Sequence, residues 1–235
     1  MEADHLRTDM ARLLIHVEGQ TEEDFVNEVL HEYLRAKGFE SVSARIVGNA
    51  RVRQGRGGIK PWPSVKKDIV AHLKEDATCI ATTMVDFYAL PRGANGGWPG
   101  RDAAQGSAIE KAAHVESAIS ADIALEMGDR FNARRFVPYV VMHEFEALLF
   151  SDCVAFSQGI GRPHLAQQLQ AVRNGFESPE EIDDSPVTAP SKRIELLVPG
   201  YEKPLLGVLG ILSIGLDQIR SECPCFDGWL TKLEG

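Results

Sequence analysis

Short apolar runs alternate with amphipathic stretches along the first part of the chain. Runs of this length, rich in β-branched residues and bounded by glycine or acidic residues, are typical of buried strands. They cover residues 12–17 (RLLIHV), 41–47 (SVSARIV), 78–86 (TCIATTMVD) and 135–142 (RFVPYVVM). Pro138 in the last run predicts an edge strand or a bulge, because proline cannot donate a hydrogen bond to a neighbouring strand.

Between these runs, apolar residues recur every three or four positions, which is the spacing of one helix face. The helices predicted in this way cover residues 21–37, 64–76 and 107–127. Thr21, with Asp24 three residues later, resembles a capping box and is the predicted N-cap of the first helix.

Strands separated by helices predict parallel pairing through right-handed crossovers. The predicted fold class is therefore α/β, with a mainly parallel four-stranded, Rossmann-like sheet flanked by helices. From about residue 144 onward the pattern contains helices and loops only, so we expect a C-terminal helical extension packed on the sheet. Residues 1–143 would form the α/β core and residues 144–235 the extension, within one structural unit.

Composition narrows the class of protein. The chain has 235 residues, of which 44% are hydrophobic, enough to bury one sizeable core. No apolar run reaches the ~20 residues that span a membrane, and the N-terminus lacks the apolar centre of a signal peptide. We therefore expect a cytoplasmic protein with no membrane partner. The four cysteines are expected to be thiols, because Cys223-x-Cys225 alone falls short of a zinc ligand set.

Three of the predicted strands are followed by, or end in, acidic residues. Glu18 follows the first, Asp86 ends the third, Glu144 and Glu146 follow the fourth, and Glu22 lies four residues beyond Glu18. Residues beyond the carboxyl ends of parallel strands converge in space. Clustered carboxylates suit Mg²⁺ or Mn²⁺, which polarise a phosphoryl oxygen and activate water. We therefore predict a metal site formed by these five carboxylates.

Several of these residues also have simpler interpretations that need no metal. Acids in a first helical turn are favoured by the helix dipole, so Glu22 alone means little. Glu144 and Glu146 face the same way in an extended segment but diverge by about 200° in a helix, and the sequence leaves open which points inward. His143 is a candidate base or metal ligand, or a histidine that caps a buried strand.

The net charge of −9 argues against binding nucleic acid over the whole surface, but it leaves room for a local basic site. We predict such a site in the loop after the second strand, with Trp62 available to stack on a base. Its basic residues are Arg51, Arg53, Arg56 and Lys60. The alternative is a solvated loop without a ligand. A second loop, with Arg92, Trp98 and Arg101, could close over a substrate from the same rim.

Six segments carry a resemblance to a known family. They are VEGQTEEDF, MVDFYALP, HEFEALLF, PSKRIELL, YEKP and GLDQIRSECPCFDGWLTKLE. Together they resemble the DUF4276 family of bacterial proteins, which is related to the TOPRIM fold of the OLD-type nucleases. The resemblance extends from about residue 12 to 233. It implies a TOPRIM-like sheet with a glutamate after the first strand and an acidic motif after the third.

The resemblance also implies roles for individual residues. By position, Glu18 matches the TOPRIM glutamate, Glu22 the second acid of OLD-type nucleases, and Asp86 the first acid of a D-x-D motif. The chain departs from the pattern at Tyr88, which stands where the second acid would be. Because tyrosine binds Mg²⁺ poorly, the complete site would require Glu144 or Glu146 in its place.

OLD-type sites use a late lysine to neutralise charge in the transition state, and the resemblance makes Lys192 the candidate, with Arg193 as the alternative. The predicted catalytic residues are then Glu18, Asp86, Glu144 and Lys192.

The leading hypothesis is a Mg²⁺- or Mn²⁺-dependent nuclease with DNA, before RNA, as its substrate. The resemblance implies a role in prokaryotic phage defence beside an ABC-type ATPase, which would supply any ATP hydrolysis because this chain lacks a G-x-x-x-x-G-K-[ST] motif. Tyr88 favours an alternative, a catalytically inactive TOPRIM-like subunit that binds nucleic acid or the ATPase. Phosphotransfer on small nucleotides is a third hypothesis, and a homodimer is one option for the assembly.

Overall fold

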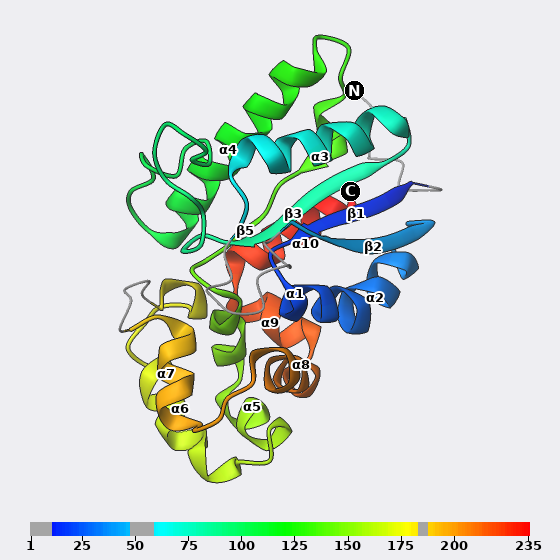
Figure 1. Cartoon of the computed structure of the whole chain (residues 1–235). Helices are drawn as coiled ribbons and strands as arrows, with labels where there is room; N and C mark the ends of the chain where they lie inside the picture. Colours follow the sequence, from blue (N-terminus) through cyan, green and yellow to red (C-terminus); the bar gives the residue numbers. More distant parts are fainter. Residues whose placement is uncertain (1–10, 48–58, 183–187) are drawn as a thin grey trace.

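A parallel sheet forms the centre of the computed structural model, which describes residues 11–47, 59–182 and 188–235 (Figure 1). The strands described are β1 (Arg12–Val17), β2 (Ser41–Ile46), β3 (Ile80–Asp86), β4 (Phe136–Val137) and β5 (Val140–Val141). They lie in the order β2-β1-β3-β4, and β5 also pairs with β3. The strand pairings described are parallel, and Leu13 lies between Val42 and Ile80. The α/β class and the parallel sheet are thus confirmed.

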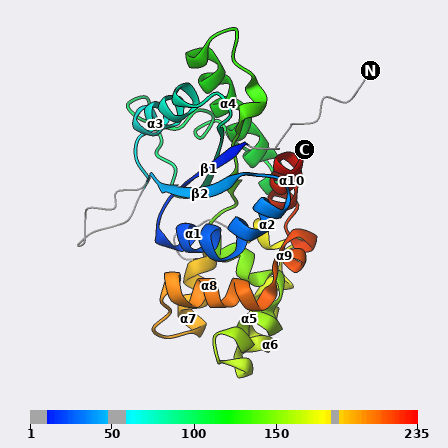
Figure 2. The same cartoon turned by 90° about the vertical axis from the view of Figure 1, so that its right-hand side faces the viewer.

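Helices cover both faces of this sheet (Figures 1 and 2). One face carries α3 (Trp62–Glu75) and α4 (Ala108–Met127). The other carries α1 (Gln20–Phe25), the π-helical turn η1 (Val26–Leu30), α2 (His31–Ala36) and the C-terminal α10 (Pro224–Glu234). The first predicted helix thus begins at Gln20, with Gly19 rather than the predicted Thr21 as its N-cap.

Strand β3 serves both cores, since all its residues are buried and its side chains alternate between the faces. Ala81 and Val85 pack in the cluster under α3 and α4, whereas Ile80 and Met84 pack in the cluster under α1 and α10. Thr82 shares the face of Met84, where its Oγ1 accepts a hydrogen bond of 2.8 Å from the Trp229 indole. The C-terminal helix is therefore fastened to the central strand.

The fourth predicted strand is divided at Pro138 into β4 and β5, and β4 stands at the end of the described strand order. Thr83 compensates for the break in the ladder. Its hydroxyl donates to the Tyr139 carbonyl at 2.9 Å and accepts from the Tyr139 N–H at 3.0 Å. The expectation of an edge position at Pro138 is thus confirmed.

The rest of the chain is helical, as predicted, and forms a lobe beside the sheet before returning to it (Figures 1 and 2). A 3₁₀ turn, η2 (Ala133–Arg135), precedes β4. After β5 the elements are η3 (Phe145–Ser151), α5 (Cys153–Gly159), η4 (Pro163–Leu165), α6 (Ala166–Arg173), η5 (Pro179–Glu181), α7 (Pro190–Leu197), α8 (Lys203–Ile214), α9 (Leu216–Glu222) and α10.

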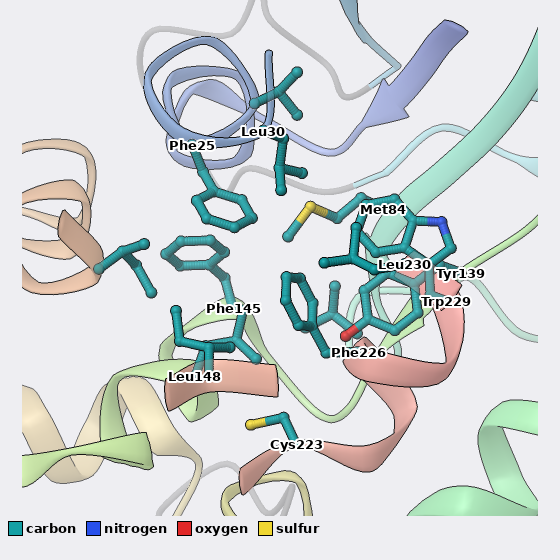
Figure 3. Close-up of a cluster of buried hydrophobic side chains, with 14 of the residues drawn as sticks. Phe25, Leu30, Met84, Tyr139, Phe145, Leu148, Cys223, Phe226, Trp229 and Leu230 are labelled. Carbon is teal, nitrogen blue, oxygen red and sulfur yellow. The ribbon is translucent and has the colours of Figure 1, made fainter. Parts of the chain in front are cut away.

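One hydrophobic cluster joins the lobe to the sheet (Figure 3). Phe25 of α1 meets Phe145 of η3 with ring centroids 5.5 Å apart, and Tyr139 stacks on Trp229 of α10 at 4.6 Å. Met84 of β3 lies among these rings. Segments from both halves of the chain therefore share one core.

All four cysteines are free thiols, as predicted. No helix in the part of the chain that the structure describes is long and apolar enough to cross a membrane.

Candidate functional site

Three segments bring acidic side chains to the carboxyl edge of the sheet. The turn from β1 into α1 carries Glu18 and Glu22, β3 ends at Asp86, and the segment after β5 carries Glu144 and Glu146. Strands β1 and β3 are direct neighbours, with Val17 paired to Met84, so Glu18 emerges beside the end of β3. The convergence predicted from the sequence follows from this pairing.

Backbone N–H groups hold three of these carboxylates. Glu22 reaches back along the first turn of α1, where its Oε2 accepts from the Gly19 N–H at 2.9 Å, as in a capping box. Asp86 Oδ1 accepts from the N–H of Phe145 at 3.0 Å. Glu144 is the extended N-cap of η3, and its Oε2 accepts from the Ser191 N–H at 3.0 Å, at the start of α7.

Glu18 and Glu146 differ from these three. The Oε2 atom of Glu18 is buried and has no hydrogen-bond partner among the described residues. Glu146 is 1% exposed, and its Oε1 lies 3.0 Å from the Lys203 ammonium. The cluster therefore contains one unsatisfied carboxylate oxygen and one carboxylate that already holds a cation.

Burial and mutual repulsion dominate the electrostatics of the cluster. Burial and the neighbouring Glu22 raise the pKa of Glu18 to about 7. Burial, followed by the charges of Glu18 and Glu22, raises the pKa of Asp86 well above its usual range. Burial also raises the pKa of Glu22 and of Glu146. Because carboxylates gathered in a weakly solvated place resist ionisation, the cluster favours any group that brings positive charge.

Lys203 is such a group. Its burial alone would lower its pKa, but the charges of Glu146, Glu144 and Asp86 raise the pKa above its usual range. It is the first residue of α8, where the helix dipole disfavours a cation. The carboxylates therefore account for a lysine in this position.

The close approach of α8 to α1 positions Lys203. A Cβ at Gly207 would lie 3.5 Å from Thr21 of α1, 3.6 Å from Phe145 of η3 and only 3.3 Å from the Tyr201 hydroxyl. A larger residue at Gly207 would therefore press on the contacts that bring the first turn of α8 to the acids.

Lys192 lies elsewhere. It is on the surface of α7 and forms an ion pair of 2.6 Å with Glu195, in which the two side chains are 50% and 40% exposed. The alternative, Arg193, donates from Nε to the Thr188 carbonyl at 2.7 Å and lies over the Phe176 ring. The structure thus brings Lys203, and not Lys192, to the carboxylates. The sequence signal for Lys203 is a lysine in the first turn of a helix, where the helix dipole disfavours a cation.

His143 and Tyr88 lie beside the cluster in different settings. His143 is buried, and its Nδ1–H donates to the Ile182 carbonyl at 2.8 Å, which matches the reading of a histidine that closes a buried strand. Tyr88 is 39% exposed, and its backbone N–H donates to the His143 carbonyl at 3.2 Å. The side chain that replaces the expected second acid is therefore partly turned to solvent.

The aromatic side chains expected to face nucleic acid are buried. Trp62 and Trp98 pack on each other at 4.8 Å, and the Trp62 indole donates to Asp122 at 2.6 Å. The interpretation of Trp62 as a base-stacking residue is therefore wrong. Arg101 is buried too, with its guanidinium 3.7 Å above the Phe87 ring, so this loop is packed rather than a free lid.

The basic loop lies largely outside the described residues. Arg51, Arg53 and Arg56 fall in that segment. Lys60, at its end, is half-buried, and its carbonyl accepts from the Trp98 indole at 3.2 Å.

The donors of the cluster match a hard divalent cation in kind, since they are carboxylate oxygens and one of them lacks a partner. Within residues 11–47, 59–182 and 188–235, no group of three or more His, Cys, Asp and Glu side chains is arranged to hold a metal ion as it stands. Cation binding would therefore require some of these side chains to change position.

The family model described as "Domain of unknown function (DUF4276)" matches residues 17–234. No curated protein and no solved structure matches the chain.

Proposed function

This chain belongs to the DUF4276 family, and we propose that it is a Mg²⁺- or Mn²⁺-dependent nuclease with a TOPRIM-like site related to that of OLD-type nucleases. It acts in the cytoplasm, in phage defence, together with a partner ATPase. Its substrate is DNA, with RNA as the second candidate. The observation that carries the proposal is the pair of Glu18 and Asp86. They lie at the carboxyl ends of neighbouring parallel strands, and the charge of Glu18 raises the pKa of Asp86.

The donor set supports this choice of chemistry. Glu18, Glu22 and Asp86 would hold the divalent cation, which when bound lowers the pKa of water and offsets charge on a phosphoryl oxygen. The Lys203 ammonium adds a fixed positive charge that can stabilise the oxygens of a phosphate as negative charge develops on them. Together these groups meet the two needs of phosphodiester hydrolysis, an activated water and a stabilised anion.

A second candidate function is a subunit that binds nucleic acid or the ATPase without cleaving. Tyr88 supports it, because the residue in the position of the second acid is partly exposed and is not a carboxylate. The hydrogen bonds that now engage Glu22 and Asp86 are also compatible with a structural role.

A metal titration tests the proposal. Mn²⁺ and Mg²⁺ would be titrated into the wild type, Glu18→Gln and Asp86→Asn. Asn keeps an oxygen that can accept from the Phe145 N–H, so the second variant separates loss of charge from loss of fold. The proposal expects saturable binding that both substitutions abolish, with unchanged circular dichroism.

Cleavage assays separate the two candidate functions. The proposal expects the wild type to cleave DNA or RNA in the presence of Mn²⁺. If the wild type alone is inactive, the assay is repeated with the partner ATPase. Asp86→Asn should not cleave under either condition. Metal binding without cleavage under any of these conditions would favour the binding subunit. Undiminished metal binding by Asp86→Asn would refute the site itself.

A further inference from the structure

A pocket lies at the edge of the sheet, along β4, with a cavity volume of about 570 Å³. Its floor is the buried apolar segment Phe136, Val137 and Pro138. Its walls are α4 and α10, which cover opposite faces of the sheet and both contact β4. The volume is that of sites for small molecules. None of the described residues that line the pocket belongs to the carboxylate cluster, so the proposed nuclease chemistry does not account for it.

The wall from α4 brings polar groups to this apolar floor. Ala113, Glu116, Ser117 and Ser120 line the pocket, and their spacing places them along one face of the helix. The Glu116 side chain is 14% exposed, and its Oε1 accepts from the Val140 N–H at 3.2 Å. Because an ionised carboxylate can accept about four hydrogen bonds, Glu116 has acceptor capacity left for a ligand in the pocket.

Positive charge lines the same pocket. Lys232 of α10 reaches Glu116, with its Nζ 3.5 Å from Oε2, and the lysine side chain is 60% exposed. Arg134, just before β4, also lines the pocket. Burial raises the pKa of Glu116, and the charge of Lys232 opposes this rise. A matching ligand therefore offers N–H donors to an enclosed carboxylate and negative charge to Lys232 and Arg134.

An edge strand is also a template for a further strand, but β4 is poorly suited to that. It has only 2 residues, and Pro138, which follows it, has no N–H group to extend a ladder of hydrogen bonds. A small molecule with a planar apolar face can cover the floor without such a ladder. The edge therefore favours a small ligand over an extended peptide.

We propose that this pocket binds a guanine nucleotide, with the base on the floor formed by β4, its N1–H and N2–H groups donating to Glu116, and its phosphate beside Lys232 and Arg134. Guanine presents adjacent N–H donors on one edge, and a single carboxylate can accept both. Adenine presents its amino group next to a ring nitrogen that is itself an acceptor, so the carboxylate favours guanine.

Calorimetric titration of guanosine monophosphate (GMP) and adenosine monophosphate (AMP) into the full chain tests the proposal. EDTA in the buffer removes divalent ions, so the result does not depend on the proposed nuclease function. We expect one GMP per wild-type chain, bound at least about tenfold more tightly than AMP, because a bidentate contact to a base discriminates by about this much.

Two substitutions separate recognition of the base from recognition of the phosphate. Glu116→Gln keeps an oxygen for the Val140 N–H but presents an amide to the base. It should weaken GMP binding by about tenfold and leave AMP binding undiminished, because a side-chain amide suits adenine. Lys232→Met should weaken both nucleotides alike, by about twofold to fivefold, and leave guanosine binding unchanged. Lys111→Met, on α4 but outside the described lining, is the matched control and should bind GMP as the wild type does.

The outcomes that would overturn the proposal are equally specific. Equal affinity of the wild type for GMP and AMP would refute the recognition of guanine. Undiminished GMP binding by a folded Glu116→Gln would place the nucleotide elsewhere, and the absence of saturation at millimolar GMP would refute the site. If circular dichroism shows that Glu116→Gln does not fold, the comparison of GMP with AMP in the wild type and the response of Lys232→Met still decide.

Discussion

The ammonium of Lys203, at the start of α8, lies 3.0 Å from Oε1 of Glu146 in η3, so this contact joins the carboxylate cluster to α8. Glu146 has almost no access to water, so it depends on the lysine for compensation of its charge. Removing one partner of a buried ion pair leaves the other charge uncompensated.

We therefore expect Lys203→Met to destabilise the protein by about 2 kcal/mol at pH 8, less than for a fully buried pair because the lysine is partly exposed. Without the lysine, the pKa values of the acids rise further in the folded state. An acid whose pKa is raised on folding contributes its full stability below the pKa that it has in the unfolded chain. This contribution is lost as the pH rises through the pKa that it has in the folded chain. The variant should therefore approach the wild type near pH 4.5.

Urea denaturation at the two pH values measures this effect. Lys192→Met is the control and should change the free energy of unfolding by less than about 0.5 kcal/mol, because its ion pair with Glu195 is exposed. An equal loss for both variants, or a loss that does not depend on pH, would contradict the assignment of Lys203 to the cluster.

Glu18→Gln should have the opposite effect on stability. Burial and Glu22 raise the pKa of Glu18 to about 7, above the ordinary value of 4.5. The stability associated with protonated Glu18 is complete below pH 4.5 and is lost as the pH rises through 7, where the folded chain must carry a buried charge. A neutral glutamine avoids this loss, so we expect a gain of about 2 kcal/mol at pH 8.

The same variant should lose the metal, so stability and function would move in opposite directions, as is common at active sites. The measurement is urea denaturation at pH 8 and at pH 4.5, where the gain should vanish. A destabilised Glu18→Gln at pH 8 would mean that attraction to the Asp86 N–H and to Lys203 outweighs the cost of burial and repulsion, and the site would have to be reassigned.

The sequence predicted the elements that depend on local pattern. The bounds of β1 are those of its apolar run, and α3 and α4 lie within one or two residues of the amphipathic stretches, because periodicity reports directly which face is buried. The convergence of Glu18 and Asp86 followed from the parallel topology.

The choice of lysine could not be predicted in this way. Lys192 and Lys203 both lie in the first turns of short helices that begin with proline nearby. Which of them meets the acids depends on how α8 packs on α1, through Gly207, and that is a tertiary contact. Trp62 was misread for a similar reason, since its partners Trp98 and Asp122 come from distant parts of the sequence.

His16 should control the stability of the protein in acid. It lies fully buried on β1, and its Nδ1–H donates to the Thr82 carbonyl at 3.1 Å, so its other ring nitrogen accepts from His72 at 3.3 Å. Burial lowers the pKa of His16 from 6.5 to about 3. Its contribution to stability is therefore complete above pH 6.5 and is lost as the pH falls toward 3.

The free energy of unfolding should fall between pH 7 and pH 4.5 by about 2 kcal/mol less in His16→Gln than in the wild type, whatever the effect of the substitution at pH 7. The measurement is a series of urea transitions across this range. His164→Gln, at an exposed position of η4, is the control and should leave the slope unchanged. Equal slopes for the wild type and His16→Gln would show that His16 is not buried in its neutral form.

Two glycines in C-terminal helices should respond to alanine in opposite directions. At Gly210 of α8, a Cβ would lie 2.6 Å from the Phe156 ring and 2.8 Å from a Leu149 methyl group. Relieving this overlap requires α5 or η3 to move, so Gly210→Ala should destabilise the protein by about 1–3 kcal/mol. At Gly228 of α10, a Cβ meets nothing within 4 Å, and Gly228→Ala should stabilise by about 0.5–1 kcal/mol through helix propensity.

Thermal and urea unfolding of the two variants checks this pair of predictions. Because Gly210 sits on the helix that begins with Lys203, a shift of α8 should also weaken Mn²⁺ binding in Gly210→Ala. Gly228→Ala, on the helix that packs on β3 through Trp229, should bind Mn²⁺ as the wild type does. Loss of stability in Gly210→Ala without any change in metal binding would separate the packing of α8 from the position of Lys203.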